Sequence, residues 1–416
     1  MVRRGLAAII CVVLTCAMCS AEDWPQFRGF HRDGKSTETG LLKQWPAGGP
    51  KLLWEVDSLG EGYTSAAISQ GAVYITGLIG KEGVVHAFNL DGTPKWKRAY
   101  GPEWLRSYRA TRSTPTVEGD RMYLLSGVGV VYCLSTADGR EIWSRDVFSE
   151  YDGQAPLWGM SEQILIDGDN LICTPGGKRA SIVTLNKMTG EVIWACSELT
   201  EASTYCSPRI VDMQDTRLMV TMLRDSVVGL DARTGRLLWR DLFDEYHTDR
   251  GRAVNANIPI IHEGRVFTTS GYDNGGAMLH LSADGTAAKR IWTTDTLDTH
   301  HGHVLLIDGY LYGSTWTSNS RGRWACIRWT DGEVMYDTDW NGNKGSLIYA
   351  EGMLYCYAED DGHLALVRPT PERFDIVSSF KITKGAGKFW AHPSISDGRL
   401  YVRHGDYLMV YDIRNK

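Results

Sequence analysis

Residues 113–143, STPTVEGDRMYLLSGVGVVYCLSTADGREIW, contain one complete structural repeat. Short apolar runs around Val117, Tyr123 and Tyr132 are separated by glycine-containing turns, and the stretch ends on Trp143 after the pair Asp138-Gly139. Short apolar runs between turn residues are typical of antiparallel strands, and Asp-Gly supplies the positive-φ residues of a tight hairpin. We therefore expect four short strands here, with a tryptophan on the last one.

The same pattern recurs along the chain. A large aromatic side chain follows each successive turn, at Trp96, Trp143, Trp194, Trp239, Trp292, Tyr336 and Phe380. A lone four-stranded sheet cannot bury both faces, so copies stack around an axis until a ring closes, and the aromatic rings pack between neighbouring sheets. The sequence thus predicts an all-β fold, an eight-bladed β-propeller of four-stranded antiparallel blades.

The two ends of the repeat region complement each other. The last period, from His392 to Asp412, provides only three strands, whereas Leu52-Leu-Trp54 is a strand without a blade of its own. Pairing this N-terminal strand with the C-terminal blade would complete the eighth sheet and remove two exposed strand edges.

The N-terminal residues predict export. A basic start, an apolar run over 6–18 and small residues near Ala21 are the parts of a secretory signal peptide, here 1–21. Cys19 follows Met18, which is a poor lipoprotein cleavage site. We expect a leader over 22–50, the propeller over 51–416, no membrane span, and a location in the periplasm or outside the cell.

Charge and cysteine content narrow the class of protein further. The net charge is −6 and no basic block follows the first residues, so we expect no nucleic-acid partner. Six cysteines remain beyond the signal, mostly within apolar strand patterns, and we expect them to be buried small side chains. Cys196 and Cys206 are the one pair whose spacing raises the possibility of a disulfide.

The repeat resembles the pyrroloquinoline quinone (PQQ)-like repeat family. The shared features are Ser-x-Pro, Gly-x-x-Tyr and Thr-Gly-x-x-x-Trp, and Asp23-Trp-Pro-Gln-Phe-Arg-Gly29 resembles the leader of secreted bacterial members. The resemblance covers roughly residues 50–416. It implies a propeller, but the family includes PQQ-dependent alcohol dehydrogenases as well as non-catalytic scaffolds of outer-membrane protein assembly, so the fold does not choose the function.

Loops that enter the innermost strands of a propeller gather around one mouth of its central channel. Polar and aromatic residues occupy these positions, and we expect a ligand or cofactor to contact Arg112, Trp158, Glu162, Asn257, His301, Trp390 and His392.

Two metal sites are conceivable at this mouth. Glu162, Asn257 and Asp298 offer hard oxygen ligands for Ca²⁺. The resemblance to quinoprotein dehydrogenases implies that such a site would hold calcium with PQQ, and that Asp298 would be the candidate catalytic base. Alternatively, His301 and His303 share a strand face and could bind a metal together with His392. The chain lacks the adjacent cysteine pair and the CxxCH haem motif of that chemistry.

Two classes of function fit these features. We favour an exported, non-catalytic scaffold that binds a protein, glycan or small ligand at the channel mouth, with no cofactor assigned. The alternative is a periplasmic PQQ- and Ca²⁺-dependent dehydrogenase. A further alternative is a scaffold related to outer-membrane assembly factors.

Overall fold

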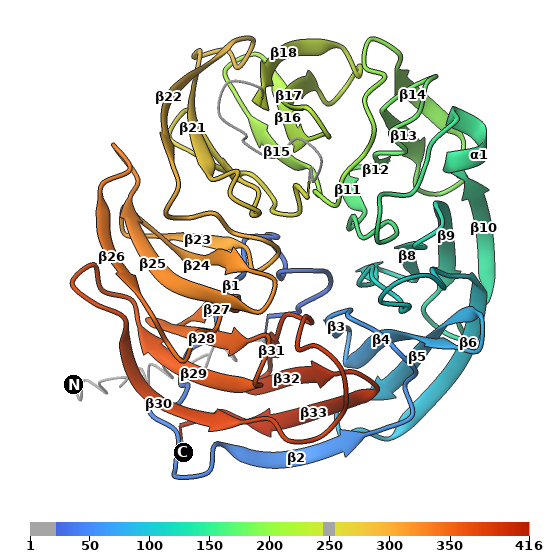
Figure 1. Cartoon of the computed structure of the whole chain (residues 1–416). Coiled ribbons are helices and arrows are strands. Elements are labelled where there is room, and N and C mark those ends of the chain that lie inside the picture. The colour runs from blue at the N-terminus through green and yellow to red at the C-terminus, as the bar shows by residue number, and fades with distance from the viewer. Residues whose placement is uncertain (1–21, 244–253, 416) are drawn as a thin grey trace, which may run out of the picture.

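The computed structural model describes residues 22–243 and 254–415, and it consists of eight sheets arranged in a ring (Figure 1). The predicted signal peptide lies outside the described residues. Each blade has four antiparallel strands, with one short parallel strand from residues 35–36 added to the seventh, which confirms the predicted eight-bladed β-propeller.

The first four blades follow one another along the chain. Their strands are β3 (Ala67–Ser69), β4 (Ala72–Ile79), β5 (Glu82–Asn89) and β6 (Pro94–Pro102); β7 (Thr116–Glu118), β8 (Arg121–Leu125), β9 (Val130–Ser135) and β10 (Glu141–Asp146); β11 (Leu165–Asp167), β12 (Asn170–Cys173), β13 (Ile182–Asn186) and β14 (Val192–Cys196); and β15 (Arg209–Asp212), β16 (Arg217–Met222), β17 (Ser226–Asp231) and β18 (Leu237–Leu242). A single short helix, α1 (Val147–Tyr151), follows the second blade.

The remaining blades complete the ring. Their strands are β19 (Ile260–His262), β20 (Arg265–Thr269), β21 (Gly276–Leu281) and β22 (Ala288–Thr294); β23 (Val304–Ile307), β24 (Tyr310–Ser318), β25 (Arg321–Arg328) and β26 (Val334–Thr338); β27 (Gly345–Ala350), β28 (Met353–Ala358), β29 (His363–Arg368) and β30 (Asp375–Lys381); and β31 (Ser394–Ser396), β32 (Arg399–His404) and β33 (Tyr407–Asp412) with β2 (Lys51–Val56).

The repeated tryptophan joins neighbouring blades around much of the ring. The indole Nε1 of Trp143 on β10 donates a hydrogen bond to the carbonyl of Lys187 in the third blade, at 3.1 Å. Its ring covers the turn at Gly190, where a Cβ atom would lie 2.8 Å from the ring and φ is +76°. Trp96 and Trp194 contact the next blade in the same way. The tryptophan of one blade thus packs on the Thr-Gly or Asp-Gly turn of the next blade.

The ring closes where the sequence predicts. Strand β2 pairs antiparallel with β33, with Trp54 opposite Val410. Trp54 then repeats the inter-blade contact, because its Nε1 donates to the carbonyl of Leu90 in the first blade at 2.9 Å. The two chain ends therefore share one sheet.

The cores of the blades are apolar, and the cysteines belong to them. Cys133, Cys173, Cys196, Cys206, Cys326 and Cys356 are all buried and free, which confirms their prediction as small buried side chains and leaves the Cys196–Cys206 pair unbonded. In the part of the chain that the structure covers, no helix is long and apolar enough to cross a membrane.

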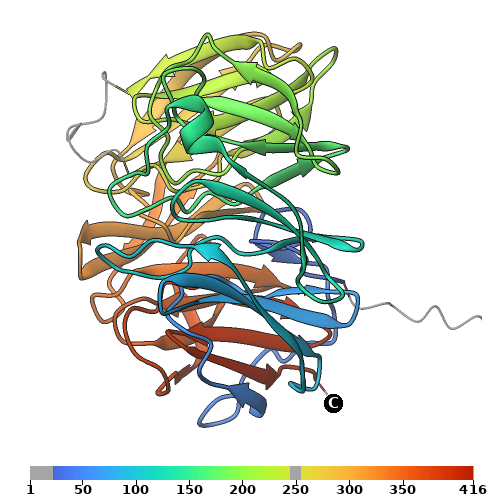
Figure 2. The same ribbon diagram turned by 90° about the vertical axis from the view of Figure 1, so that its right-hand side faces the viewer.

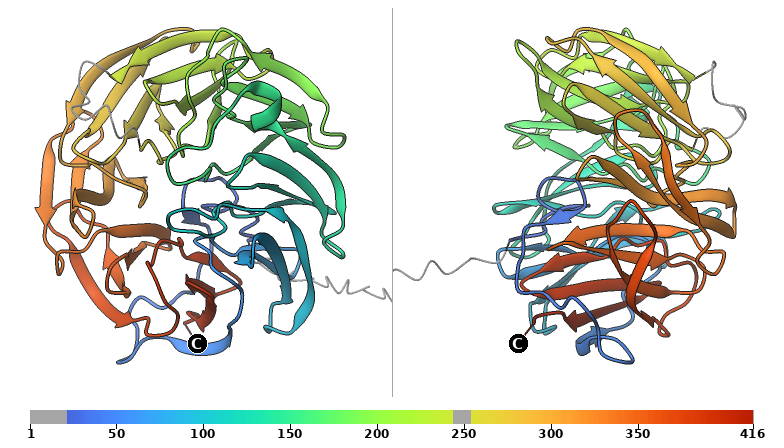
Figure 3. Two further views of the ribbon diagram at one scale, coloured as in Figure 1. Left: turned by 45° about the vertical axis from the view of Figure 1, so that its right-hand side comes forward. Right: turned by 90° about the vertical axis from the view of Figure 1, so that its left-hand side faces the viewer.

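The leader, residues 22–50, lies across one face of the disc (Figures 2 and 3). Trp24 forms a bridge with Ile68 of the first blade, and the carbonyl of Pro25 accepts from Val117 of the second blade. Strand β1 (Lys35–Ser36) pairs parallel with β27 of the seventh blade. Because the leader crosses the axis, it covers one end of the central channel.

Candidate functional site

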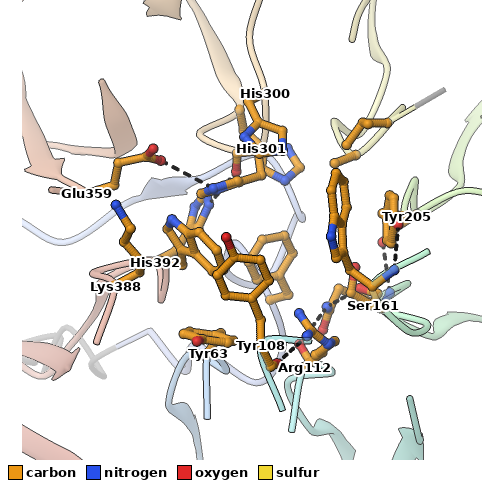
Figure 4. Close-up of a pocket in the computed structure, with 18 of the residues that line it drawn as sticks. Tyr63, Tyr108, Arg112, Ser161, Tyr205, His300, His301, Glu359, Lys388 and His392 are labelled. Carbon is orange, nitrogen blue, oxygen red and sulfur yellow. Dashed lines mark hydrogen bonds and ion pairs between the residues drawn. The ribbon is translucent and has the colours of Figure 1, made fainter. Parts of the chain in front are cut away.

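A cavity of about 310 Å³ opens at the other end of the channel (Figure 4). Its walls come from two kinds of loop, those that enter the innermost strands and those that join second to third strands. The residues that line it include Phe27, Tyr63, Tyr108, Arg112, Trp158, Ser161, Gln163, Tyr205, Tyr272, His300, His301, His303, Asn319, Ser320, Glu359, Lys388, Trp390 and His392.

The leader supplies the floor of this cavity. The ring of Phe27 lies with its centroid 5.3 Å from that of His303 and 4.9 Å from that of His392, in edge-to-face geometry. The next residue, Arg28, is buried and donates to the carbonyls of Val304 and Leu347 on the innermost strands of the sixth and seventh blades. The channel is therefore a blind cavity rather than an open pore.

Aromatic rings form two groups on the walls. Trp158 stacks with Tyr205 and Tyr272, with ring centroids 6.1 and 6.2 Å apart. The ring centroid of Trp390 lies 4.9 Å from that of Tyr63 and 5.0 Å from that of Tyr108. Apolar and aromatic walls with a few placed polar groups are typical of sites for small organic ligands.

Two cations lie among these rings. Arg112 donates to the carbonyl of Tyr108, and its guanidinium lies 5.6 Å from the ring centroid of Tyr63. Burial lowers the pKa of Arg112, but an arginine remains charged at neutral pH. Lys388 forms an ion pair with Asp360 at the edge of the cavity. The mouth therefore carries positive charge beside aromatic surface.

A histidine, a glutamate and a lysine form a chain of contacts on the wall across the cavity from Tyr205 (Figure 4). His301 Nε2 lies 3.2 Å from Glu359 Oε2, and the buried Lys344 Nζ lies 2.5 Å from Glu359 Oε1. Burial lowers the pKa of His301 to about 3, so its imidazole is neutral at physiological pH. Burial raises the pKa of Glu359 to about 7, against the opposing effect of Lys344. The lysine thus compensates the carboxylate, while the imidazole stays uncharged.

The hydrogen bonds of His392 leave one of its nitrogens free. Its Nε2 lies 2.9 Å from the carbonyl of His301, so that nitrogen must carry the proton, and Nδ1 is left as an acceptor. This Nδ1 is buried without a partner, and so is the indole Nε1 of Trp390, a donor. Buried polar atoms without partners are rare in folded proteins, and each calls for an explanation. Four of them belong to side chains that line this cavity: the acceptor His392 Nδ1, the donors Trp390 Nε1 and Arg112 Nε, and His301 Nε2, which lies at ion-pair distance from Glu359.

The proposed calcium ligands do not converge on the cavity. Glu162 Oε2 accepts from the backbone and hydroxyl groups of Thr174, at 2.9 and 2.6 Å. The amide of Asn257 donates to the carbonyls of Thr269, Thr299 and His300.

Asp298 likewise accepts from the backbone N–H groups of Asp273 and Gly275. Burial raises its pKa to about 6 and that of Glu162 to about 7. None of the three lines the cavity, and apart from Glu162 Oε1, which is buried without a hydrogen-bond partner, their oxygens accept hydrogen bonds at separate strand ends, so these residues do not fit a shared Ca²⁺–PQQ centre.

The three histidines considered as metal ligands are close to one another but are used differently. His303 Nδ1 accepts from the backbone N–H of Ile258 at 3.2 Å, and His392 is bonded to the carbonyl of His301. Within residues 22–243 and 254–415, no group of three or more His, Cys, Asp or Glu side chains is arranged to hold a metal ion.

Comparison with known proteins places the chain in a family. Residues 81–338, more than half of the sequence, match the family described as outer membrane protein assembly factor BamB. The chain belongs to the BamB family. A curated BamB of Kangiella koreensis is 27% identical over 217 residues, which are 50% of this chain and 48% of that protein. The chain therefore spans about half the length of this relative.

Solved structures show the same fold as this BamB-family chain. BamB from Moraxella catarrhalis superposes with a TM-score of 0.61 and 14% identity, over 88% of this chain and 98% of that chain. The quinohemoprotein alcohol dehydrogenase of Comamonas testosteroni superposes with a TM-score of 0.68 and 14% identity, over 95% and 81%. These findings confirm the resemblance to PQQ-like propeller repeats, and at such identities the structures establish the fold alone.

The structure of this BamB-family chain brings five of the residues predicted to contact a ligand together at the mouth. Arg112, Trp158, His301, Trp390 and His392 all line the cavity. Phe27 of the leader was not among the predicted residues, nor were Tyr272, Asn319, Ser320 and Glu359, which follow second strands. Strands alternate in direction, so a loop from the second to the third strand lies on the same face as a loop that enters the first. That alternation was the signal available in the sequence.

Proposed function

We propose that this BamB-family chain is an exported, non-catalytic scaffold whose blind cavity binds one or two sugar rings at the end of a glycan. Aromatic faces can cover the apolar face of a sugar ring, and a hydroxyl group both donates and accepts hydrogen bonds. The unpartnered Trp390 Nε1 and His392 Nδ1 on the cavity wall carry this proposal, because one requires an acceptor and the other a donor.

The remaining polar groups support the same class of ligand. Asn319, Ser320 and Ser161 line the cavity and offer further uncharged hydrogen-bonding groups, whereas the amide of Gln163 is already hydrogen-bonded to Thr114 and Ser161. The volume of about 310 Å³ lies at the lower end of the range for small-molecule sites. Arg112 and Lys388 would favour a sugar that carries a carboxylate.

The geometry argues against a hydrolase at this position. Nucleophilic catalysis needs a serine or cysteine within hydrogen-bonding reach of a base. Across the described residues, none of the cavity serines is hydrogen-bonded to a histidine; the hydroxyl of Ser207, for example, accepts from the backbone of Gln163. The dehydrogenase alternative is disfavoured because Glu162, Asn257 and Asp298 are already hydrogen-bonded away from the cavity.

Titration with soluble oligosaccharides tests the proposal, with neutral and uronate-containing chains as probes and calorimetry as the readout. Trp390→Phe keeps an aromatic ring but removes Nε1–H, and we expect about five- to tenfold weaker binding, the value of one hydrogen bond. Trp340→Phe is the matched control, because Trp340 packs on Trp324 and Phe374 away from the cavity. Failure of every oligosaccharide to bind, or equal binding by both variants, would overturn the proposal.

Outer membrane protein assembly is a second candidate function, favoured by the family itself. Leu157 is 71% exposed, and Leu105 and Tyr108 are 43% and 50% exposed. These residues belong to the loops before β11 and β7 and could contact an unfolded protein. Binding of an unfolded outer-membrane protein that is lost in Leu157→Asp would support this function. Absence of binding would count against it without affecting the sugar proposal.

A further inference from the structure

A second, smaller cavity of about 220 Å³ lies on the face of the disc that the leader covers. The leader forms hydrogen bonds or bridges with every other blade, but none with the described residues of the fifth blade. The cavity fills this gap, between the leader and the innermost strand β19. Its lining includes Arg28, Arg32, Asp33, Lys35, Arg209 and His262.

Four of these side chains are cationic, and their hydrogen bonds go to neutral groups. Arg32 donates to the carbonyls of Gln163 and Ile164, at 3.0 and 2.8 Å. Lys35 Nζ donates to the carbonyl of Leu306 at 2.6 Å, and Arg209 donates to the carbonyl of His31. Arg28, as described above, also donates to carbonyls.

Across residues 22–243 and 254–415, the positive charge of this cavity is offset only in part, by Asp33 and at longer range by Glu162. Among the described residues, none of these four cations has a carboxylate within ion-pair distance, and Asp33 is the one carboxylate in the lining. Buried charges are normally paired, because burial without a counter-charge is costly. Burial, with repulsion from Arg209, lowers the pKa of Arg32 to about 10. The charged form of Arg32 is therefore less favourable here than in water, as expected for a cation without an adjacent carboxylate.

One cation also keeps an unused donor. Arg32 is 4% exposed, and its Nε is buried without a hydrogen-bond partner. Guanidinium groups donate in a planar fork that matches the oxygens of phosphate, and arginine clusters are common where phosphate is recognised. The cavity therefore combines excess positive charge, arginine side chains and space for a tetrahedral anion.

We propose that this cavity between the leader and the fifth blade binds a phosphate group, either as free phosphate or as the phosphomonoester of a larger molecule. The bound anion would offset part of the positive charge of Arg28, Arg32, Lys35 and Arg209, and it would link the leader to the fifth blade, with whose described residues the leader forms no hydrogen bond or bridge. This site is separate from the mouth cavity and does not depend on what binds there.

Calorimetric titration of the full mature chain with inorganic phosphate, and separately with glycerol 3-phosphate, tests the proposal. Lys35→Gln and Arg209→Gln each remove one charge, and we expect at least tenfold weaker binding in each, with a smaller rise in melting temperature on adding phosphate. Arg233→Gln is the matched control, because Arg233 is an exposed arginine of the fourth blade paired with Asp231, and it should bind like the wild type.

The two probes distinguish the sources of the phosphate group. Tighter binding of glycerol 3-phosphate indicates a phosphomonoester ligand, and equal or tighter binding of inorganic phosphate indicates the free anion. The proposal is overturned if neither probe binds at millimolar concentration, or if both cavity variants bind as tightly as Arg233→Gln. Melting temperatures measured without phosphate show whether each variant is folded.

Discussion

The two ends of the central channel are built from similar polar residues but are used in opposite ways. At the leader end, Arg28 donates to carbonyls of two innermost strands and Arg32 to carbonyls just before a third, and together they close the channel. At the mouth, Trp390 and His392 keep buried polar atoms without protein partners. The difference teaches that the arginines at one end of a propeller axis can give most of their donors to the blades, with Arg32 Nε the exception, while side chains at the other end keep several polar atoms without protein partners.

Replacing Arg28 tests the structural role of the leader end and should have the largest effect. Arg28→Met removes donors from the carbonyls of Asp33, Val304 and Leu347. Buried carbonyls without donors are costly, so we expect the free energy of unfolding to fall by about 3 kcal/mol. Urea denaturation measures this change, with the exposed Arg140→Met as the control. A decrease of less than about 1 kcal/mol in the unfolding free energy would mean that the hydrogen bonds of Arg28 contribute little to holding the leader on the ring.

Replacing Phe27 tests whether the mouth cavity and the cavity between the leader and the fifth blade are independent sites. Phe27→Ala removes a half-buried ring, and we expect a loss of about 2 kcal/mol in unfolding free energy. Oligosaccharide affinity should fall about tenfold, whereas phosphate affinity should not change. Phe30→Ala, at an exposed position of the same leader, is the control. Parallel losses of both affinities would show that the two cavities act as one site.

The histidines of the mouth predict a smaller, pH-dependent effect. Burial lowers the pKa of His300, His301, His303 and His392. Above about pH 6.5 they are neutral in both states, but below it the unfolded chain takes up protons that the folded chain does not, so stability falls as the pH falls.

His303→Gln should reduce that acid-side slope by about 1.4 kcal/mol per pH unit. Unfolding free energies measured between pH 6.5 and 5 test this, with His31→Gln as the control. The buried Glu162 has the opposite effect, because its raised pKa favours the folded state as the pH falls. Glu162 is present in both the wild type and His303→Gln, so its effect cancels when their slopes are compared. An unchanged slope in His303→Gln would show that this histidine is protonated in the folded state.

The sequence alone determined the fold because the decisive contacts are local and repeated. The Thr-Gly or Asp-Gly turn and the tryptophan after it recur in most periods, and the structure pairs Trp143 with the turn at Gly190 and Trp54 with the turn at Gly92. The unmatched strand at Trp54 likewise predicted the closure against β33, because a lone strand and a three-stranded blade each leave an exposed edge.

Only the tertiary structure decided the composition of the site. The leader resembled a family signature in sequence, but its role as the floor of the mouth depends on contacts between Phe27 and His303 that are distant in the chain. Whether Glu162 or His392 faces a ligand depends on which neighbour takes its hydrogen bonds, Thr174 in one case and His301 in the other. Local pattern fixes strands and turns, whereas the availability of a polar atom is settled by packing around the whole ring.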